Sequence, residues 1–207
     1  ARREVLQHAH ALAYFFDRFI EECPPEGLSE ELLLSTHKIL CAGWEDSFAG
    51  KYRDCRVATK FERTECMRAE AIPDYMARMV KDFNEQVDLR WPRSGATTPN
   101  VFTVAARYHN QLAMIHPFVD GNGRMSRILL NGILFKYSRA DCSSPSQRLV
   151  APIGKDLDEK WEYLDTTTSA SKVFRDEDME VPFAKQTYHE KFAKMVRNKG
   201  RGIARLY

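Results

Sequence analysis

The chain has 207 residues, of which 43% are hydrophobic and 29% are charged, proportions that exclude wholesale disorder and fit one globular domain with a sizeable core. The 31 Lys and Arg residues nearly balance the 29 Asp and Glu residues, so the net charge is only +2. This balance disfavours a protein that grips nucleic acid through its phosphates.

Two amphipathic helices are predicted near the N-terminus. Apolar residues recur at three- and four-residue steps between residues 2 and 22, and Pro24-Pro25 should end that helix. Ser29 is a suitable N-cap for a second helix. Residues 43 to 60 then break the helical pattern, and the spacing of Tyr52, Val57 and Phe61 predicts a short strand pair.

Three stronger helical patterns follow in the middle of the chain. One begins at Pro73, which suits a first helical position. After a polar loop over residues 91–99, Asn100 should cap a second helix that ends at His116, because the residue before a proline is pushed out of the helical region. A third runs from about residue 122 to 137, and weaker patterns cover residues 157–168 and 183–196. We therefore expect a mainly α-helical single domain over residues 1–207.

The sequence gives only limited information about cellular location. No apolar stretch reaches the length of a membrane span, so we expect no membrane association. The five cysteines form no Cys-x-x-Cys pair, which favours reduced thiols in an intracellular, cytoplasmic setting. Because the chain opens at Ala1 without an initiator Met, we expect it to be an excised domain.

One segment, residues 116–127, combines the features of an anion site with those of a base. It reads His-Pro-Phe-Val-Asp-Gly-Asn-Gly-Arg-Met-Ser-Arg, so a helix end, a glycine-bearing loop and a new helix start follow one another. The N–H groups of residues 121–124 should point out of the new helix start, where the helix dipole favours an anion. Glycine at positions 121 and 123 should let a phosphate approach the backbone.

Charged side chains flank this anion site. Arg124 and Arg127 are three residues apart and share one helical face, which Asn131 continues. Asp120 would repel a phosphate unless Mg²⁺ lay between them. His116 stands at a helix C-terminus, where we expect the dipole to favour its cationic form and strengthen it as a base.

Each of these residues alone has a structural explanation: a helix cap, a turn or a solvated face. Their occurrence within twelve residues favours function. The segment also resembles the signature of the Fic family, His-Pro-Phe-x-Asp/Glu-Gly-Asn-Gly-Arg-x-x-Arg, at every fixed position. The resemblance covers about residues 43–140, with residues 1–42 and 141–207 as flanking helices. It implies a Fic-type helical core with a small β-hairpin flap.

The family usually transfers AMP from ATP to a Ser, Thr or Tyr hydroxyl of a target protein and releases pyrophosphate. By position, the resemblance implies a general base at His116, a Mg²⁺ ligand at Asp120, an anion hole at Gly121, Asn122 and Gly123, β- and γ-phosphate ligands at Arg124 and Arg127, and a nucleotide-pocket residue at Asn131. It also implies a flap that pairs with an extended target segment, with Lys51, Tyr52, Arg56 and Val57 in it. Tyr163 could be an adenine-side wall or a core aromatic.

Several alternatives stay open. The Doc branch of the family, whose outcome resembles that of kinases, has Lys where this chain has Gly123, so AMP transfer is favoured over phosphate transfer. Many members carry an inhibitory Ser/Thr-x-x-x-Glu-Gly/Asn helix, and no Ser or Thr here has a Glu four residues later. Either the chain is therefore not self-inhibited, or the inhibitor lies outside these residues or on a partner. A homo-oligomer is a separate possibility. Another nucleotide donor, removal of AMP from a target, and a non-catalytic binding module are further possibilities.

Overall fold

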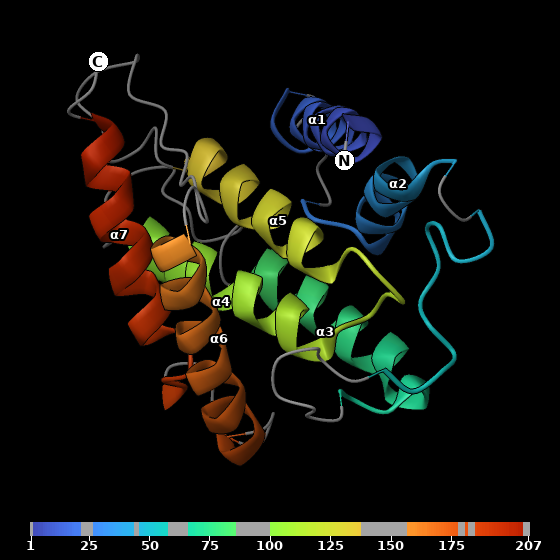
Figure 1. The fold of residues 1–207 in the computed structure, drawn as a ribbon. Helices are drawn as coiled ribbons and strands as arrows, with labels where there is room; N and C mark the ends of the chain where they lie inside the picture. Colours follow the sequence, from blue (N-terminus) through green and yellow to red (C-terminus); the bar gives the residue numbers. More distant parts are fainter. Residues whose placement is uncertain are drawn as a thin grey trace.

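The computed structural model describes residues 2–21, 27–43, 46–57, 66–85, 100–137, 157–177, 181 and 185–204. Within these ranges the chain is helical and has no strand, which confirms the mainly α-helical class (Figure 1). In chain order the elements are α1 (Arg2–Phe16), the π-helical turn η1 (Asp17–Glu21), α2 (Glu30–Cys41), the 3-10 turn η2 (Ala69–Ala71), α3 (Ile72–Phe83), α4 (Val101–Ile115), α5 (Asn122–Tyr137), α6 (Leu157–Glu177) and α7 (Glu190–Ala204).

Helices α4 and α5 lie side by side at the centre of the molecule (Figure 1). Helices α1 and α2 cover one side of this pair, α6 and α7 cover the other, and α3 packs beside α4. The loop over residues 116–121 joins α4 to α5, and it is the first half of the segment that the sequence singled out. The coil after α2 lies at the same end of the molecule as this loop (Figure 1).

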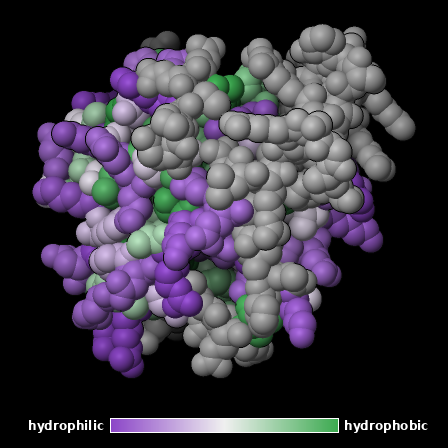
Figure 2. Space-filling view, turned by 180° about the vertical axis from the view of Figure 1, so that it is seen from behind, coloured by the Kyte–Doolittle hydropathy of each residue, from purple (hydrophilic) through white to green (hydrophobic). Residues whose placement is uncertain are grey.

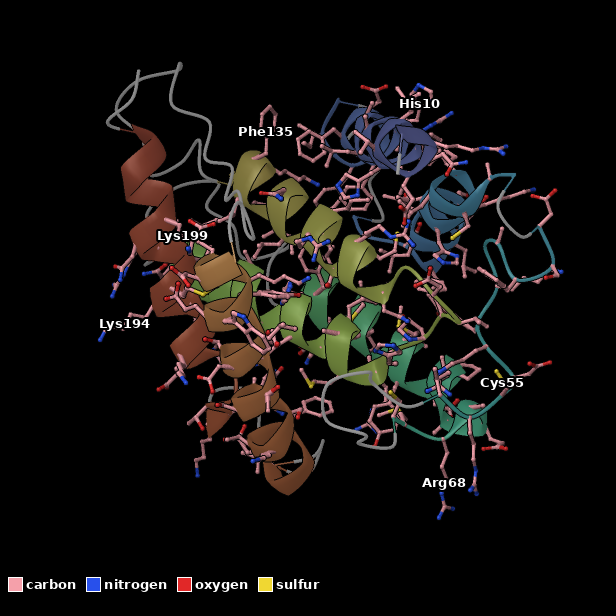
Figure 3. The ribbon with its side chains drawn as sticks, in the orientation of Figure 1. His10, Cys55, Arg68, Phe135, Lys194 and Lys199 are labelled. Atoms are coloured by element: carbon pink, nitrogen blue, oxygen red, sulfur yellow. The ribbon has the colours of Figure 1, made fainter. Side chains whose placement is uncertain are left out.

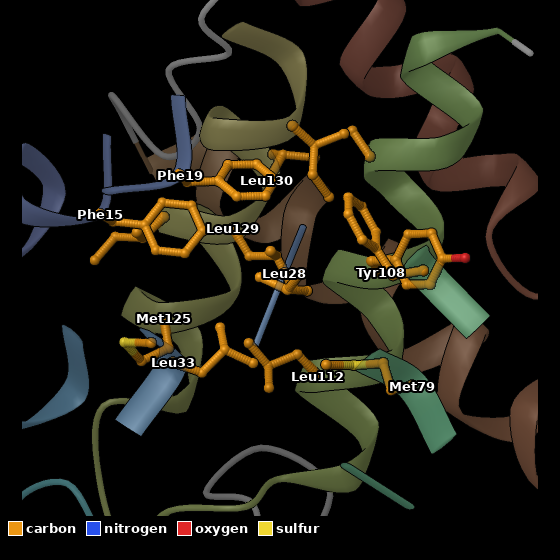
Figure 4. Close-up of a cluster of buried hydrophobic side chains, with 14 of the residues drawn as sticks. Phe15, Phe19, Leu28, Leu33, Met79, Tyr108, Leu112, Met125, Leu129 and Leu130 are labelled. Atoms are coloured by element: carbon orange, nitrogen blue, oxygen red, sulfur yellow. The ribbon is translucent and has the colours of Figure 1, made fainter. Parts of the chain in front are cut away.

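The core forms where the apolar faces of these helices meet. Helix α5 is buried on most of its circumference, because Ile128, Leu129, Leu130, Ile133 and Leu134 are all inaccessible to solvent. Figure 4 shows part of this core, which also includes Phe15, Phe19, Leu28, Leu33, Met79, Tyr108, Leu112 and Met125. Burial of this much apolar surface fixes α5, and with it the motif at its N-terminus.

The predicted helix boundaries are confirmed where capping chemistry was visible in the sequence. The Ser29 hydroxyl accepts a hydrogen bond from the Leu32 N–H at 3.1 Å and caps α2. The Asn100 side chain accepts one from the Phe102 N–H at 3.0 Å and caps α4. Pro73 occupies the first turn of α3, and α4 ends with His116 as its C-cap. Helix α5 has the predicted bounds.

The strand pair predicted between residues 43 and 60 is not found among the described residues. One backbone hydrogen bond, from the Cys66 N–H to the Val57 carbonyl at 3.2 Å, joins the two arms of this segment. Phe61 and the loop over residues 91–99 lie outside the described residues. Among the described residues of this segment, no ladder of the kind that defines a strand accompanies this bond.

The last two helices differ from their predicted bounds. Helix α6 continues to Glu177, and α7 begins only at Glu190. The Glu177 carboxylate accepts hydrogen bonds from the Thr187 hydroxyl at 2.6 Å and from the Thr187 N–H at 2.8 Å. These bonds hold residue 187 in an irregular connection, so α7 starts after it.

On the face opposite to that of Figure 1, hydrophilic side chains cover most of the area that the described residues form (Figure 2). No helix among the described residues is long and apolar enough to cross a membrane. Cys41 and Cys55 are free thiols, and Cys55 lies on the exposed coil after α2 (Figure 3).

Candidate phosphate-binding and catalytic site

His116 terminates α4 in a left-handed conformation, with φ 51° and ψ 57°. Its Nδ1 lies 3.3 Å from the carbonyl oxygen of Ala113. A ring nitrogen facing a carbonyl must carry the proton, so this contact leaves Nε2 as the acceptor. The half-buried ring therefore presents the nitrogen that a general base needs.

The expectation that the helix dipole makes His116 a stronger base is wrong. Burial lowers the pKa of His116 below its usual value, and the positive charge of Arg53 lowers it further. The hydrogen bond to Ala113 and the charge of Asp120 raise this pKa without reversing the shift. Burial dominates because it removes water from the cationic form. At neutral pH the ring is neutral, which is the protonation state of a base ready to accept a proton.

Arg53 anchors the coil after α2 to the catalytic loop. Its side chain is 3% exposed, and its guanidinium donates to the carbonyl oxygens of His116 at 2.7 Å, Cys55 at 2.7 Å and Met67 at 2.6 Å. Its backbone N–H donates to the Pro117 carbonyl at 2.9 Å. Arg53 lies between the predicted flap residues Tyr52 and Arg56, and nothing in its neighbours indicated that the guanidinium turns inward.

His37 supports the same loop from α2. The Gly50 N–H donates to its Nδ1 at 3.0 Å, so Nε2 carries the proton and donates to the Asp120 carbonyl at 3.0 Å. Its ring stacks on Phe118 with centroids 3.7 Å apart. Burial lowers the pKa of His37 to about 4, which keeps this arrangement neutral. The three- and four-residue spacing of Leu33, His37 and Leu40 was the available signal that His37 faces the core.

Two loop residues of the motif stabilise the conformation of the loop itself. Gly121 has φ +84°, and a Cβ there would lie 3.3 Å from both His37 and Leu40. This glycine is thus required by the turn and by packing, and its predicted role in the anion hole stays a prediction. The Asn122 amide accepts from the Phe118 N–H at 2.9 Å and donates to the Phe118 carbonyl at 2.8 Å. Its side chain closes the loop, and only its backbone N–H is left for an anion.

The start of α5 provides the predicted anion cradle. The Met125 N–H makes the first bond within the helix, to the Gly121 carbonyl at 2.9 Å, so the N–H groups of residues 122–124 precede the helical ladder. Gly123 is exposed, and a Cβ there would meet only the Arg127 guanidinium, at 3.6 Å. Of the two glycines, Gly123 is the one that leaves the cradle open to a ligand.

Arg124 is engaged by carboxylates. It forms an ion pair with Asp120 at 2.9 Å and a second with Glu4 of α1 at 3.6 Å. The Asp120 side chain is 64% exposed, so this carboxylate is open to solvent beside the cradle. The sequence did not indicate Glu4, because the approach of α1 to the motif depends on tertiary packing.

Arg127 is held differently, by neutral groups. Its guanidinium carbon lies 6.0 Å from the centre of the Tyr163 ring of α6. The Asn131 amide donates to the Arg127 carbonyl at 2.9 Å. Arg124 and Arg127 both lower the pKa of His8 on α1, after the larger effect of burial, so both charges act at the same edge of α5.

The four predicted flap residues differ in their contacts and exposure. The Tyr52 hydroxyl donates to Glu30 at 2.6 Å, and its ring packs near Phe118, so Tyr52 anchors the coil. The Lys51 amine donates to the Ser47 carbonyl at 3.2 Å. Arg56 is exposed and Val57 is half-buried. A target-binding role remains a prediction for all four residues, of which Arg56 and Val57 lie nearest to the segment outside the described residues.

A cavity of about 320 Å³ lies between α3, α4 and the C-terminal part of α6. Arg107, Gln111 and Ile115 line it from α4, whereas the motif does not contribute to it. This cavity is thus separate from the candidate site.

Metal ligation at the motif would depend on Asp120. No group of three or more His, Cys, Asp or Glu side chains that could hold a metal ion occurs among the described residues. A single exposed carboxylate beside an anion cradle suits a Mg²⁺ ion that takes its remaining ligands from phosphate oxygens and water.

Several solved structures share this fold. A Fic-domain signaling protein from Bacteroides thetaiotaomicron aligns with a TM-score of 0.69 at 20% identity, over 95% of this chain and 67% of that one. Fic-1 from C. elegans aligns with a TM-score of 0.63 at 20% identity, over 99% and 52%. BepC from Bartonella tribocorum, solved with bound AMPPNP, aligns with a TM-score of 0.55 at 15% identity, over 94% and 86%.

Sequence comparison finds relatives of the same kind. A Fido domain-containing protein of Dictyostelium discoideum is 38% identical over 71 residues, which are 34% of this chain and 45% of that protein. The protein adenylyltransferase Fic of Nematostella vectensis is 29% identical over 133 residues, or 64% of this chain and 28% of that protein. The chain thus spans less than half the length of these curated relatives. The Fic/DOC family matches residues 27–134, which include α2 and the whole motif, and the chain belongs to this family.

Proposed function

We propose that the protein transfers AMP from ATP to a hydroxyl side chain of a target protein. The observation that carries the proposal is the position of His116, whose acceptor Nε2 stands at one end of a short loop while two arginines flank the helix start at its other end. A base and an anion cradle are thus joined by six residues, 116–121. Relatives named protein adenylyltransferase support the same activity.

The chemistry follows from the roles that these groups can fill. The target hydroxyl gives its proton to Nε2 of His116, and its oxygen forms a bond to the α-phosphorus of ATP. The bond from that phosphorus to the bridging oxygen breaks, and pyrophosphate leaves. The N–H groups of residues 122–124 and the two arginines stabilise the charge on the phosphates, since fixed donors outside bulk water are already oriented for it.

Asp120 would hold Mg²⁺ in this reaction. The ion would screen the phosphate charge and orient the leaving pyrophosphate. Its arrival would compete with the Asp120–Arg124 ion pair of 2.9 Å, so that Arg124 exchanges a carboxylate for a phosphate. In this proposal the acceptor of the AMP group is a Ser, Thr or Tyr hydroxyl on a separate target protein.

The donor is tested by paired labelling. The domain is incubated with Mg²⁺ and a cognate lysate, and with ATP labelled on either the α- or the γ-phosphate. The proposal predicts covalent label on protein from the α-phosphate only. Label from the γ-phosphate only would replace AMP transfer by phosphate transfer, and nucleotide binding without label would favour a binding module.

A further inference from the structure

Tyr163 lies on α6, outside the residues that match the family, yet its hydroxyl reaches the buried side of the motif helix. The hydroxyl is 3.2 Å from Nε2 of His109 on α4. Its ring lies under the guanidinium of Arg127, 6.0 Å from the guanidinium carbon. Burial raises the pKa of this hydroxyl, and the positive charge of Arg127 on α5 lowers it. A single side chain thus connects three helices at the second motif arginine.

His109 fixes the direction of this hydroxyl. Its ring is inaccessible to solvent and stacks on Phe192 of α7 with centroids 4.3 Å apart. Its Nδ1 lies 3.0 Å from the Asn110 amide oxygen, so Nδ1 carries the proton and Nε2 accepts from the Tyr163 hydroxyl. Burial lowers the pKa of His109 to about 3, so the ring stays neutral under ordinary conditions. The bond from Tyr163 to His109 therefore holds the Tyr163 ring beside Arg127.

Arg127 differs from Arg124 in the kind of group that contacts its guanidinium. Two carboxylates, from Asp120 and Glu4, pair with Arg124. Among the described residues no carboxylate pairs with Arg127, whose guanidinium lies over the aromatic ring of Tyr163. When only neutral groups hold an arginine, its positive charge is available to an incoming phosphate. Because the side chain is already held in place, it loses less conformational entropy when the phosphate binds.

We propose that Tyr163, oriented by His109, is a positioning residue that holds Arg127 toward the outer phosphates of the nucleotide. The inference rests on the proposed function, because it takes Arg127 as a phosphate ligand. It replaces the adenine-wall interpretation of Tyr163: the hydroxyl serves the phosphate end of ATP, and its removal should leave recognition of the nucleoside unchanged.

The test compares ATP with AMP, because AMP lacks the phosphates that Arg127 would bind. Titration calorimetry with Mg²⁺ measures the affinity of both nucleotides for the wild type, Tyr163→Phe and Tyr108→Phe. Tyr108→Phe is a matched control, since its buried hydroxyl also makes one hydrogen bond, of 3.1 Å to Asp82. Tyr163→Phe should weaken ATP roughly three- to tenfold, as expected for one lost hydrogen bond, and leave AMP unchanged. Tyr108→Phe should change neither affinity.

Arg127→Ala separates failure of the inference from failure of the proposed function. If Arg127→Ala leaves the affinity for ATP unchanged, the phosphate role of Arg127 is wrong. If Arg127→Ala weakens ATP and Tyr163→Phe does not, the positioning role is wrong. Equal weakening of ATP and AMP by Tyr163→Phe would also overturn it. The double variant should bind ATP no more weakly than Arg127→Ala alone, because both changes act on the same contact.

Discussion

Replacing Arg53 by methionine tests whether the catalytic loop depends on the coil after α2. Methionine keeps the apolar stem of the side chain and removes the guanidinium, which donates to the carbonyl oxygens of His116, Cys55 and Met67 at 2.6–2.7 Å. In the variant these carbonyl oxygens lose their hydrogen-bond donor, and the coil after α2 loses its side-chain contact with the catalytic loop. The side chain is 3% exposed, so water does not readily take its place.

The size of the effect follows from these bonds. A hydrogen bond with a charged donor contributes about 1.5–3 kcal/mol, and three of them set an upper limit of roughly 4.5–9 kcal/mol. The loosened coil can regain water at Cys55, which is exposed, and partly at Met67. We therefore expect a loss of about 3–5 kcal/mol in the free energy of unfolding, comparable to the removal of one partner from a buried ion pair. Such a loss lowers the Tm of a domain of this size by roughly 10 °C.

Urea unfolding and thermal melting of Arg53→Met, beside Arg56→Met, measure this loss. Arg56 is three residues away and exposed, so its replacement should change the free energy of unfolding by no more than about 0.5 kcal/mol. Amide hydrogen exchange should also show faster exchange at residue 53, whose N–H is bonded to Pro117 at 2.9 Å. If both variants melt together, Arg53 does not anchor the loop.

Acidification and two glycine variants give further predictions. Burial lowers the pKa of His37 and His189 to about 4 and that of His109 to about 3. Below about pH 6.5 the unfolded state therefore binds more protons than the folded state does. As the pH falls further, the free energy of unfolding decreases by up to about 1.4 kcal/mol per pH unit for each of these residues. Urea midpoints at about pH 7.5 and about pH 5 check this, and equal midpoints would contradict it. Gly121→Ala should cost about 1–3 kcal/mol in unfolding experiments because of its φ of +84°, whereas Gly123→Ala should keep its stability and weaken ATP binding. Loss of stability in Gly123→Ala alone would reverse these assignments.

Much of the fold could be predicted because its signals are local. Caps such as Ser29 and Asn100 and the turn before Pro117 act within a few residues, so they mark helix ends in the sequence itself. The motif of residues 116–127 was equally visible, since its base, its loop and its arginines follow one another along the chain.

The parts that sequence did not reveal depend on contacts between distant residues. Glu4 reaches Arg124 across 120 positions of the chain, and Arg53 reaches His116 across 63, so no local pattern indicates either contact. The protonation of His116 was mispredicted because burial and the charge of Arg53, which both depend on the whole fold, lower its pKa. Helix α6 was predicted too short, and its contact with α5 through Tyr163 comes from packing rather than from spacing.

Transfer of α-phosphate label by His116→Ala, compared with the wild type and His10→Ala, tests the proposed function most directly. His10 is an exposed histidine on α1, away from the motif, and serves as the matched control (Figure 3). Circular dichroism and melting curves establish that each variant is folded. We predict that His116→Ala folds and transfers no label, while His10→Ala transfers label at the wild-type rate. Undiminished transfer by folded His116→Ala would contradict the assignment of His116 as the base.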